Sequence, residues 1–184
     1  MGRKLGLGGT TVIAAALLAA SWRRFGPRSD VFAFAVVWVP MTWLGTVSRV
    51  VQPQLPSSYH ELRDFESDGS VYEAVGVRLA KRLLRRGPLA FFNPDLHLPS
   101  ERTPEQLAHL EQRMKDAEAT HAILLVATLP VALHAATRRW WRAAGLTVVF
   151  DVLMNGYPVM LQRYNRALLR RRFPPSPVPV ARFS

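Results

Sequence analysis

Two stretches in the second half of the chain decide the fold: HAILLVATLPVALHAAT at 121–137 and AAGLTVVFDVLMNGYPVML at 143–161. Each is almost free of charge and falls within the roughly 17–25 residues that a helix needs to cross a hydrocarbon core of about 30 Å. The short connection between them holds two tryptophans and three arginines, which is typical of a membrane interface. The two stretches therefore predict a helical hairpin that spans a membrane.

Two further apolar stretches, at 5–22 and 31–51, predict a second hairpin near the N-terminus. Ser29 and Asp30 precede the latter stretch and suit a helix N-cap. The former stretch has a basic start and an Ala-rich end, so a cleaved secretory signal over residues 1–22 is the alternative interpretation. The predicted fold class is all-α: a polytopic helical membrane protein with about four spans in two hairpins and an amphipathic interfacial helix between them.

The polar segment 52–118 lies between the two hairpins and is too charged to cross a membrane. Within it, residues 71–86 carry Val and Leu at helical spacing and basic residues on the other faces, which predicts one helix lying on the membrane surface. Thr103 and Pro104 suit the start of another helix. Its apolar stripe runs on into 121–137, so we expect one long helix that passes from water into lipid.

The charge is strongly basic, with 24 Lys and Arg against 13 Asp and Glu. Most of the basic residues stand just beside the apolar stretches, where phospholipid head groups lie. The expected partner is thus the lipid bilayer and not nucleic acid, and the expected location is the cell membrane, crossed several times. The chain has no cysteine, which excludes disulfides and a cysteine nucleophile. We take 1–184 as a single membrane domain with a flexible Pro-rich tail at 173–184.

Glu118 and His121 are three residues apart, so they project from the same face of a helix. A carboxylate at that spacing can orient an imidazole as a general base. The alternative is a solvated glutamate beside an interfacial histidine. The further carboxylates and second Glu-x-x-His pair that a metal site in a helical bundle would need are missing, so no metal is expected.

Asp151 lies inside an otherwise apolar span, where a charge is costly unless it is paired, protonated or turned toward the bundle interior. Asn155 follows one turn later and extends a polar edge. Functional residues and simple hydrogen bonds between helices both explain such an edge. No G-x-S-x-G motif and no Gly-rich phosphate loop is present.

The run NGYPVMLQRYNR at 155–166 resembles the C-terminal signature of the glycosyl-4,4'-diaponeurosporenoate acyltransferases. The sequence FESDGSVYEAVGVRLAK at 65–81 and the Ala-Glu-x-x-His motif at 117–121 are similar to the same family. The resemblance covers roughly 59–166, and the proline-rich stretch 88–104 does not share it.

This resemblance implies a membrane-bound transferase of carotenoid biosynthesis that esterifies a sugar hydroxyl of a glycosylated carotenoid with a fatty acyl group. Its partners would be the glycosylated carotenoid and a fatty acyl donor. No cofactor is expected, and acyl-CoA or acyl carrier protein would be the co-substrate. An acyltransferase acting on another glycolipid or polyol, and a non-catalytic membrane protein that binds lipid or scaffolds a pathway, are the alternatives.

On this interpretation the catalytic residues are His121, as the general base, and Glu118, which orients it. The residues predicted to bind substrate lie on the last span and at its end: Asp151, Asn155, Gln162, Arg163, Asn165 and Arg166. Asn155 and Gln162 would donate hydrogen bonds to the developing oxyanion. One of the two arginines would hold phosphate of the acyl donor.

Overall fold

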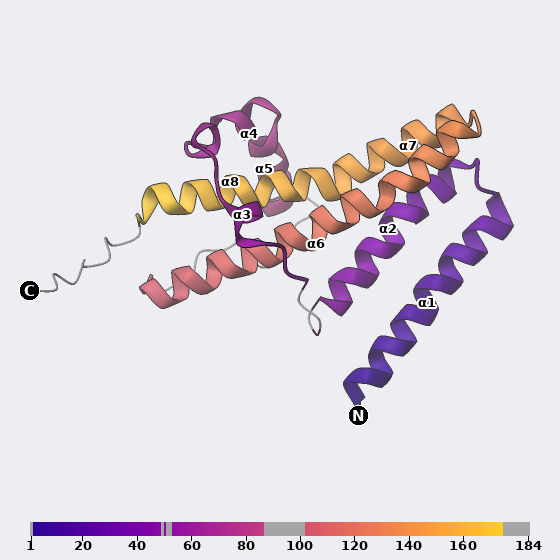
Figure 1. The fold of residues 1–184 in the computed structure, drawn as a ribbon, viewed down its shortest axis with the longest axis horizontal. Coiled ribbons are helices and arrows are strands. Elements are labelled where there is room, and N and C mark those ends of the chain that lie inside the picture. Colours follow the sequence, from indigo (N-terminus) through magenta and orange to yellow (C-terminus); the bar gives the residue numbers. More distant parts are fainter. Residues whose placement is uncertain (1, 49, 51–52, 87–101, 175–184) are drawn as a thin grey trace, which may run out of the picture.

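The computed structural model describes residues 2–48, 50, 53–86 and 102–174, and every regular element in these ranges is helical (Figure 1). The predicted all-α fold class is confirmed. From residue 175 on, the predicted flexible tail lies outside the described residues.

The N-terminal hairpin consists of α1 (Gly2–Phe25) and α2 (Asp30–Val47), which pack side by side (Figure 1). Ser29 caps α2 as predicted, because its side-chain oxygen accepts a hydrogen bond from the Phe32 N–H at 3.1 Å. Helix α2 ends at Val47, a few residues before the predicted end of this span at 51.

Three helical runs in the described part of the chain are long and apolar enough to cross a membrane: Asp30–Val47, Pro104–Thr137 and Trp141–Arg172. Helix α1 forms over the first predicted span but is not one of the three. The expectation of about four spans is thus met by four long helical runs, three of which are candidate spans.

Helix α6 (Pro104–Thr137) is the longest element, with 34 residues. At about 1.5 Å per residue it is roughly 51 Å long, more than a hydrocarbon core of about 30 Å requires. Thr103 caps it, accepting a hydrogen bond from the Gln106 N–H at 3.3 Å, and Pro104 is its first residue. The prediction of one long helix that continues from the polar segment into a span is confirmed.

The last helical run is made of α7 (Trp141–Asp151), a π-helical turn at Val152–Gly156, and α8 (Tyr157–Arg172). Helix α6 lies along both α7 and α8, and the three form the long double rod of Figure 1. Helix α2 packs against α7 and α6, which joins the N-terminal hairpin to this rod.

Residues 53–86, the described part of the polar segment before α6, form four short elements: α3 (Ser57–His60), the 3-10 turn η1 (Asp64–Glu66), α4 (Ser70–Ala74) and α5 (Val77–Arg86). Figure 1 shows α4 and α5 gathered against α8. The predicted single helix over 71–86 is therefore wrong, because the chain turns between α4 and α5.

The turn lies at Gly76, whose φ of +82° is a left-handed conformation that glycine adopts without strain. The apolar residues used to predict the surface helix are nevertheless exposed: Val71, Val75, Leu79 and Leu83. The amphipathic character of the segment is thus kept in two pieces, which suits a segment lying on the membrane surface.

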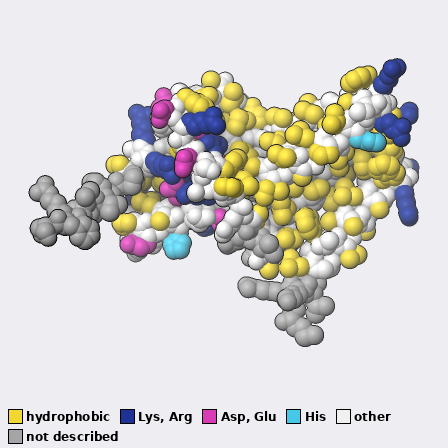
Figure 2. Space-filling view, in the orientation of Figure 1, with side chains coloured by type: hydrophobic (Ala, Val, Ile, Leu, Met, Phe, Trp, Pro, Cys, Tyr) yellow, Lys and Arg dark blue, Asp and Glu magenta, His cyan; other side chains and the backbone are white. Residues whose placement is uncertain are grey.

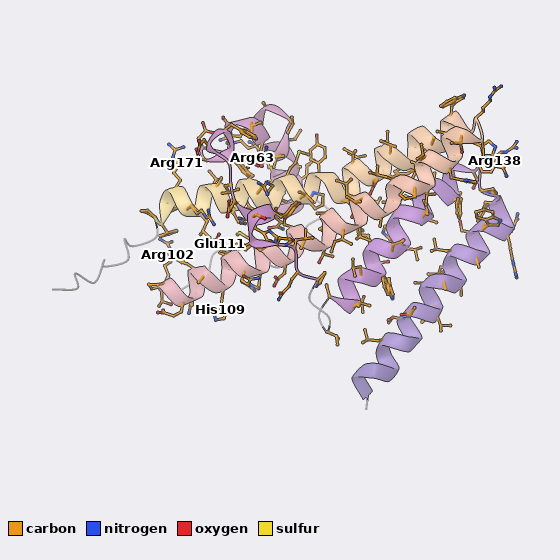
Figure 3. All side chains as sticks on the ribbon, viewed as in Figure 1. Arg63, Arg102, His109, Glu111, Arg138 and Arg171 are labelled. Carbon is orange, nitrogen blue, oxygen red and sulfur yellow. The ribbon has the colours of Figure 1, made fainter. Side chains whose placement is uncertain are left out.

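Charged and apolar side chains occupy different zones of the surface. Figure 2 shows apolar side chains over the middle of the visible face and Lys and Arg at its two ends. In Figure 3, Arg138 marks the end at the α6–α7 turn, and Arg102, His109 and Arg171 mark the opposite end. This distribution matches a protein whose middle lies in lipid and whose ends meet head groups.

Candidate functional site

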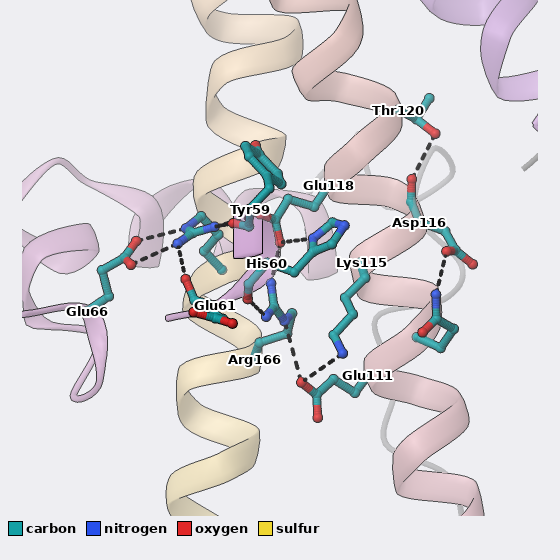
Figure 4. A network of polar contacts seen from close by, with 12 residues as sticks. Tyr59, His60, Glu61, Glu66, Glu111, Lys115, Asp116, Glu118, Thr120 and Arg166 are labelled. Carbon is teal, nitrogen blue, oxygen red and sulfur yellow. Dashed lines mark hydrogen bonds and ion pairs between the residues drawn. The ribbon is translucent and has the colours of Figure 1, made fainter. Parts of the chain in front are cut away.

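Glu118 on α6 lies at the centre of a group of buried charges between α6 and α8 (Figure 4). Its side chain is 0 % exposed. Its two carboxylate oxygens accept hydrogen bonds from Arg163 Nη1 at 2.7 Å and from Arg166 Nη1 at 2.5 Å. The two arginines are three residues apart on α8 and so reach the same carboxylate from one helix face.

Arg163 also binds Glu66 of the η1 turn through two parallel hydrogen bonds of 2.8 Å, from Nε and from Nη2. Such a fork is the strongest common pairing of arginine with a carboxylate. The same guanidinium donates to the carbonyl oxygens of Tyr59 and Glu61. The arginine thereby attaches the polar segment to the α6–α8 pair, and we call Glu66, Glu118, Arg163 and Arg166 the ion cluster.

Glu66 is held in its ionised form. Burial alone would raise the pKa of its carboxyl, but hydrogen bonds from Arg163, from the Tyr72 hydroxyl and from the Arg63 N–H outweigh burial and bring the pKa to about 2. Burial also raises the pKa of Tyr72 to about 12, so that this phenol remains a donor. Two carboxylates and two guanidinium groups make the ion cluster electrically neutral.

His60 of α3 lies beside the ion cluster. Arg166 Nη2 donates to its backbone carbonyl oxygen, and its ring Nδ1 stands 3.6 Å from Glu118 Oε2, too far for a hydrogen bond. Burial lowers the pKa of the His60 imidazole by more than Glu118 raises it, so the ring is neutral at neutral pH.

A second polar group lies one turn further along α6. His121 Nδ1 is 3.0 Å from Asn155 Oδ1, and Asn155 Nδ2 donates to Asp151 Oδ1 at 2.7 Å. Asn155 and Asp151 are 0 % and 2 % exposed, respectively. We call these three residues the His–Asn–Asp triad.

The hydrogen bonds of the triad assign the tautomer of His121. The Asn155 amide is oriented with its NH2 group toward the Asp151 carboxylate, so its oxygen faces the imidazole. An amide oxygen only accepts, so His121 Nδ1 carries the hydrogen. In the neutral ring Nε2 is then left with a free lone pair and can accept a proton.

The π-helical turn brings Asn155 into this position. A turn of this kind inserts an extra residue into an α-helix and is frequent at functional sites. Here it separates Asp151, at the end of α7, from α8, and its buried residue is Asn155. The sequence gives no signal for the turn beyond Gly156 and Pro158, which weaken a regular helix at this point.

The structure corrects one part of the predicted mechanism. Glu118 does not pair with His121, although both project from α6 on adjacent turns, because its oxygens are taken by Arg163 and Arg166. Asn155 is the partner of His121 instead. Asn155 Nδ2 gives one of its two N–H groups to Asp151, and the predicted oxyanion role of Asn155 stays a prediction.

The other predicted substrate-binding residues also face inward. Arg163 and Arg166 bind protein carboxylates in this structure, and the predicted contact of either arginine to a donor phosphate stays a prediction. Asn165 Oδ1 accepts from Lys81 Nζ at 2.6 Å and thereby ties α5 to α8. Gln162 is buried on α8, and its role stays a prediction.

Sequence reasoning missed several residues of this region, all from the polar segment or the first half of α6: His60, Glu66, Tyr72 and Glu111, whose Oε1 lies 3.7 Å from Arg166 Nε. The usable signal was the i, i+3 pair of arginines on α8. Two guanidinium groups on a helix packed against another helix require carboxylate partners. The sequence does not say which of the acidic residues supply them.

One hollow lies beside the site, and another lies further along α6. A polar cavity of about 640 Å³ lies beside the ion cluster and is lined by residues of α3 and α6, among them His60, Gln112 and Asp116. An apolar groove of about 870 Å³ runs between α6 and α7, from Val126 to Val148. Among the described residues no group of His, Asp and Glu is arranged to hold a metal ion.

A bundle of helices with three runs apolar enough to cross a membrane, and with charged side chains buried between α6 and α8, defines the general class of this chain as a helical protein suited to a membrane. The family model of glycosyl-4,4'-diaponeurosporenoate acyltransferase, CrtO, matches residues 56–173. The chain belongs to this family and is an acyltransferase of carotenoid biosynthesis. The matched range contains the whole ion cluster and the whole triad. Comparison with curated proteins and with solved structures gave no significant match.

Proposed function

We propose that this enzyme, in the cell membrane, transfers a fatty acyl group to a sugar hydroxyl of glycosyl-4,4'-diaponeurosporenoate, with His121 as the general base. The acceptor follows from the name of the family, and the acyl donor is a thioester such as acyl-CoA or acyl carrier protein. The observation that carries the assignment of the base is the hydrogen bond between His121 Nδ1 and Asn155 Oδ1, because it leaves Nε2 able to accept a proton.

The position of His121 also supports this role. It lies in α6 close to where the polar first part of the helix gives way to the apolar part that follows. A glycosylated carotenoid and a fatty acyl chain are both lipid-soluble, whereas the reacting sugar is polar, so their common reacting point belongs at such a boundary. The apolar groove between α6 and α7 lies in the apolar part of α6 that follows His121 in the sequence, and its lining suits the hydrocarbon chain of the acyl group.

The proposed reaction proceeds in two proton transfers. The sugar oxygen attacks the carbonyl carbon of the thioester while His121 Nε2 takes the hydroxyl proton, and the carbonyl oxygen becomes an oxyanion. The C–S bond of the resulting tetrahedral intermediate then breaks, and the imidazolium returns the proton to the leaving thiolate. The Nδ1–H bond to Asn155 persists throughout, and the net products are the sugar ester and a free thiol.

The test is to express the wild-type chain and a His121→Ala variant in cells that supply the glycosylated carotenoid and to measure the fatty-acid ester by mass spectrometry. General-base removal is expected to lower ester formation by about 10²- to 10⁴-fold. His109→Ala is the matched control, because His109 lies on the same helix, is exposed and has no place in the triad.

Membrane insertion of each variant is measured in parallel from the membrane fraction. Ester formation at the wild-type level in His121→Ala would remove His121 from the mechanism and leave the acceptor assignment intact. If the wild-type chain is present in the membrane but forms no ester with this acceptor, another glycolipid or a polyol becomes the candidate substrate.

A further inference from the structure

The polar cavity beside the ion cluster has a size and lining that differ from those of the apolar groove. Its volume of about 640 Å³ lies within the range of roughly 300–1,000 Å³ that is usual for small-molecule sites. It is lined by α3 and the preceding residues on one side and by one face of α6 on the other, with Arg170 of α8 at the edge: Pro53, Gln54, Leu55, Ser57, His60, Glu61, Gln112, Lys115, Asp116 and Arg170.

The charges around this cavity balance. Lys115 and Arg170 bring two positive charges, and Glu61 and Asp116 bring two negative ones. Arg170 is in turn bound to Glu111, with Nη2 2.6 Å from Oε1. No excess of positive charge remains, so the lining does not favour a phosphate or another anion.

The lining does offer many hydrogen-bonding groups of both kinds. Gln112 Nε2 donates to Asp116 Oδ1 at 2.8 Å, which fixes the two side chains beside each other and leaves the amide oxygen and the second carboxylate oxygen as acceptors. Lys115 supplies donors. Hydroxyl groups both donate and accept, so a polyhydroxylated neutral molecule is the ligand that such a mixed lining satisfies best.

His60 supplies an independent observation. Its residue is only 8 % exposed, it lines the cavity, and its Nδ1 has no hydrogen-bond partner among the described residues. This nitrogen faces Glu118 Oε2 of the ion cluster at 3.6 Å, so it does not itself contact a ligand in the cavity, and His60 contributes to the cavity as part of its wall. A neutral imidazole matches a hydroxyl, to which it can donate and from which it can accept.

We propose that this cavity binds a neutral sugar head group, with Gln112 and Asp116 as its recognition residues and His60 at its inner wall. The proposal rests on the proposed function in that the sugar would be that of the glycosylated acceptor. Asp116 lies five residues before His121 on α6, about 7.5 Å along the helix axis, so a sugar in the cavity is held on the polar side of the proposed base.

The first experiment measures kcat and KM for the glycosylated carotenoid in lipid vesicles for wild type and for the Gln112→Ala/Asp116→Ala double variant. Both side chains lie outside the buried core, so the variant is expected to fold. We expect KM to rise at least about 10-fold with kcat within about 2-fold of wild type, since the substitutions remove contacts to the sugar and not to the reacting atoms. Glu105→Ala, an exposed carboxylate further along α6, is the matched control and leaves KM unchanged.

The second experiment needs no catalysis. Saturation-transfer NMR on the full chain in lipid nanodiscs is recorded with methyl β-glucoside, and then with inorganic phosphate as competitor. We expect a signal for the glucoside that is lost in the double variant, retained in His121→Ala and unaffected by phosphate. Equal glucoside signals in wild type and double variant, no signal in wild type, or displacement by phosphate would each overturn the sugar site.

The two proposals fail separately. If wild type forms ester and the double variant keeps the wild-type KM, the sugar site is wrong and the acyl transfer stands. If wild type forms no ester but binds the glucoside through Gln112 and Asp116, the proposed acyl transfer is wrong and the sugar site stands.

Discussion

The ion cluster and the His–Asn–Asp triad are neighbours on α6 but use their polar groups in opposite ways. In the ion cluster the oxygens of Glu118 and the guanidinium groups of Arg163 and Arg166 are bound to other parts of the protein. In the triad each side chain makes a single strong contact to the next, and the series ends at an imidazole with one open nitrogen. Charged groups bound to partners of opposite charge fix a structure, whereas a ring nitrogen that is held in one orientation and carries no hydrogen can accept a proton.

The comparison also distinguishes residues that form buried ion pairs from residues that are candidates for proton transfer. Glu118 and His121 are adjacent on one helix face, which in the sequence favours a catalytic pair. The structure assigns the carboxylate to the arginines of α8 and an amide to the imidazole. A buried ion pair gains little net stability over an apolar contact, but the loss of one partner leaves an uncompensated charge. The two groups should therefore respond to substitution in different measurements.

The largest expected effect comes from Glu118→Ala. Among the described residues, removing this carboxylate leaves Arg166 with Glu111, 3.7 Å away, and Arg163 with Glu66. We expect the free energy of unfolding to fall by about 3–5 kcal/mol, as for other broken buried pairs. Reversible unfolding in detergent measures it, with Glu105→Ala as the exposed control. Wild-type stability combined with loss of ester formation would instead assign Glu118 to catalysis and remove the distinction between the two groups.

Acid should weaken the ion cluster through Glu66. Its pKa of about 2 in the folded protein lies below its ordinary value of 4.5, so the folded state binds fewer protons than the unfolded one. This carboxylate therefore contributes stability that is fully present above about pH 5 and is lost as the pH falls toward 2. A shift of this size corresponds to about 3 kcal/mol.

Unfolding measured from pH 7 to pH 2 tests this prediction. Glu66→Gln should be less stable than wild type at pH 7 and should show a flatter dependence on pH, because the titrating group is gone. Parallel curves for the two proteins would mean that Glu66 is not the group that couples acid to unfolding.

The helices and their ends follow from the sequence. The contacts between residues far apart in the sequence do not. Helix α6 begins at Pro104 because Thr103 caps it and proline suits the first helical position. Both signals can be recognised in the sequence. The break at Gly76 is readable only as a possibility, since a glycine is tolerated inside a helix at a cost of about 1 kcal/mol. The helical spacing of apolar residues continues across Gly76, and for this reason the sequence wrongly predicted a single helix over 71–86.

For the candidate site, spacing along one helix predicts which side chains share a face but not what faces them. The contact between Glu66 and Arg163 joins residues 97 positions apart. Its geometry depends on how the polar segment folds against α8. The π-helical turn likewise depends on how α7 and α8 pack on α6. Because this turn positions Asn155, the contact between Asn155 and His121 could not be predicted from the sequence. Pairings of this kind need the tertiary structure.

A smaller effect, confined to activity, is expected from Asp151→Asn. The shape is kept, but a carboxamide at this position can present either NH2 or oxygen to Asn155, so the orientation of that amide and the tautomer of His121 are no longer fixed. We expect kcat for ester formation to fall by about 10- to 100-fold, because a fraction of the molecules carries the wrong tautomer. Stability should stay within about 1 kcal/mol of wild type.

Thr147→Ser is the matched control for that variant. Thr147 is buried on α7, like Asp151, but its hydroxyl bonds within its own helix, to the Ala143 carbonyl oxygen. An unchanged kcat in Asp151→Asn would show that Asn155 keeps its orientation without the carboxylate and would shorten the triad to a pair.

The smallest expected effect is Gly69→Ala, which disturbs the packing beside the ion cluster without touching a charge. Gly69 precedes α4 with a φ of +79°, and an added Cβ would stand 2.9 Å from Tyr164 Cδ2 on α8. The left-handed conformation costs a residue with a side chain about 1–2 kcal/mol, and the tyrosine ring must also shift. We expect a fall in unfolding free energy of about that size with kcat unchanged, measured by unfolding in detergent and by ester formation.

Gly145→Ala is the control, since nothing lies within 4 Å of its added Cβ. A fall in kcat as large as that of Asp151→Asn would show that the ion cluster and the triad are mechanically coupled, because Tyr164 lies next to Arg163 in the sequence of α8 but has no bond to the triad.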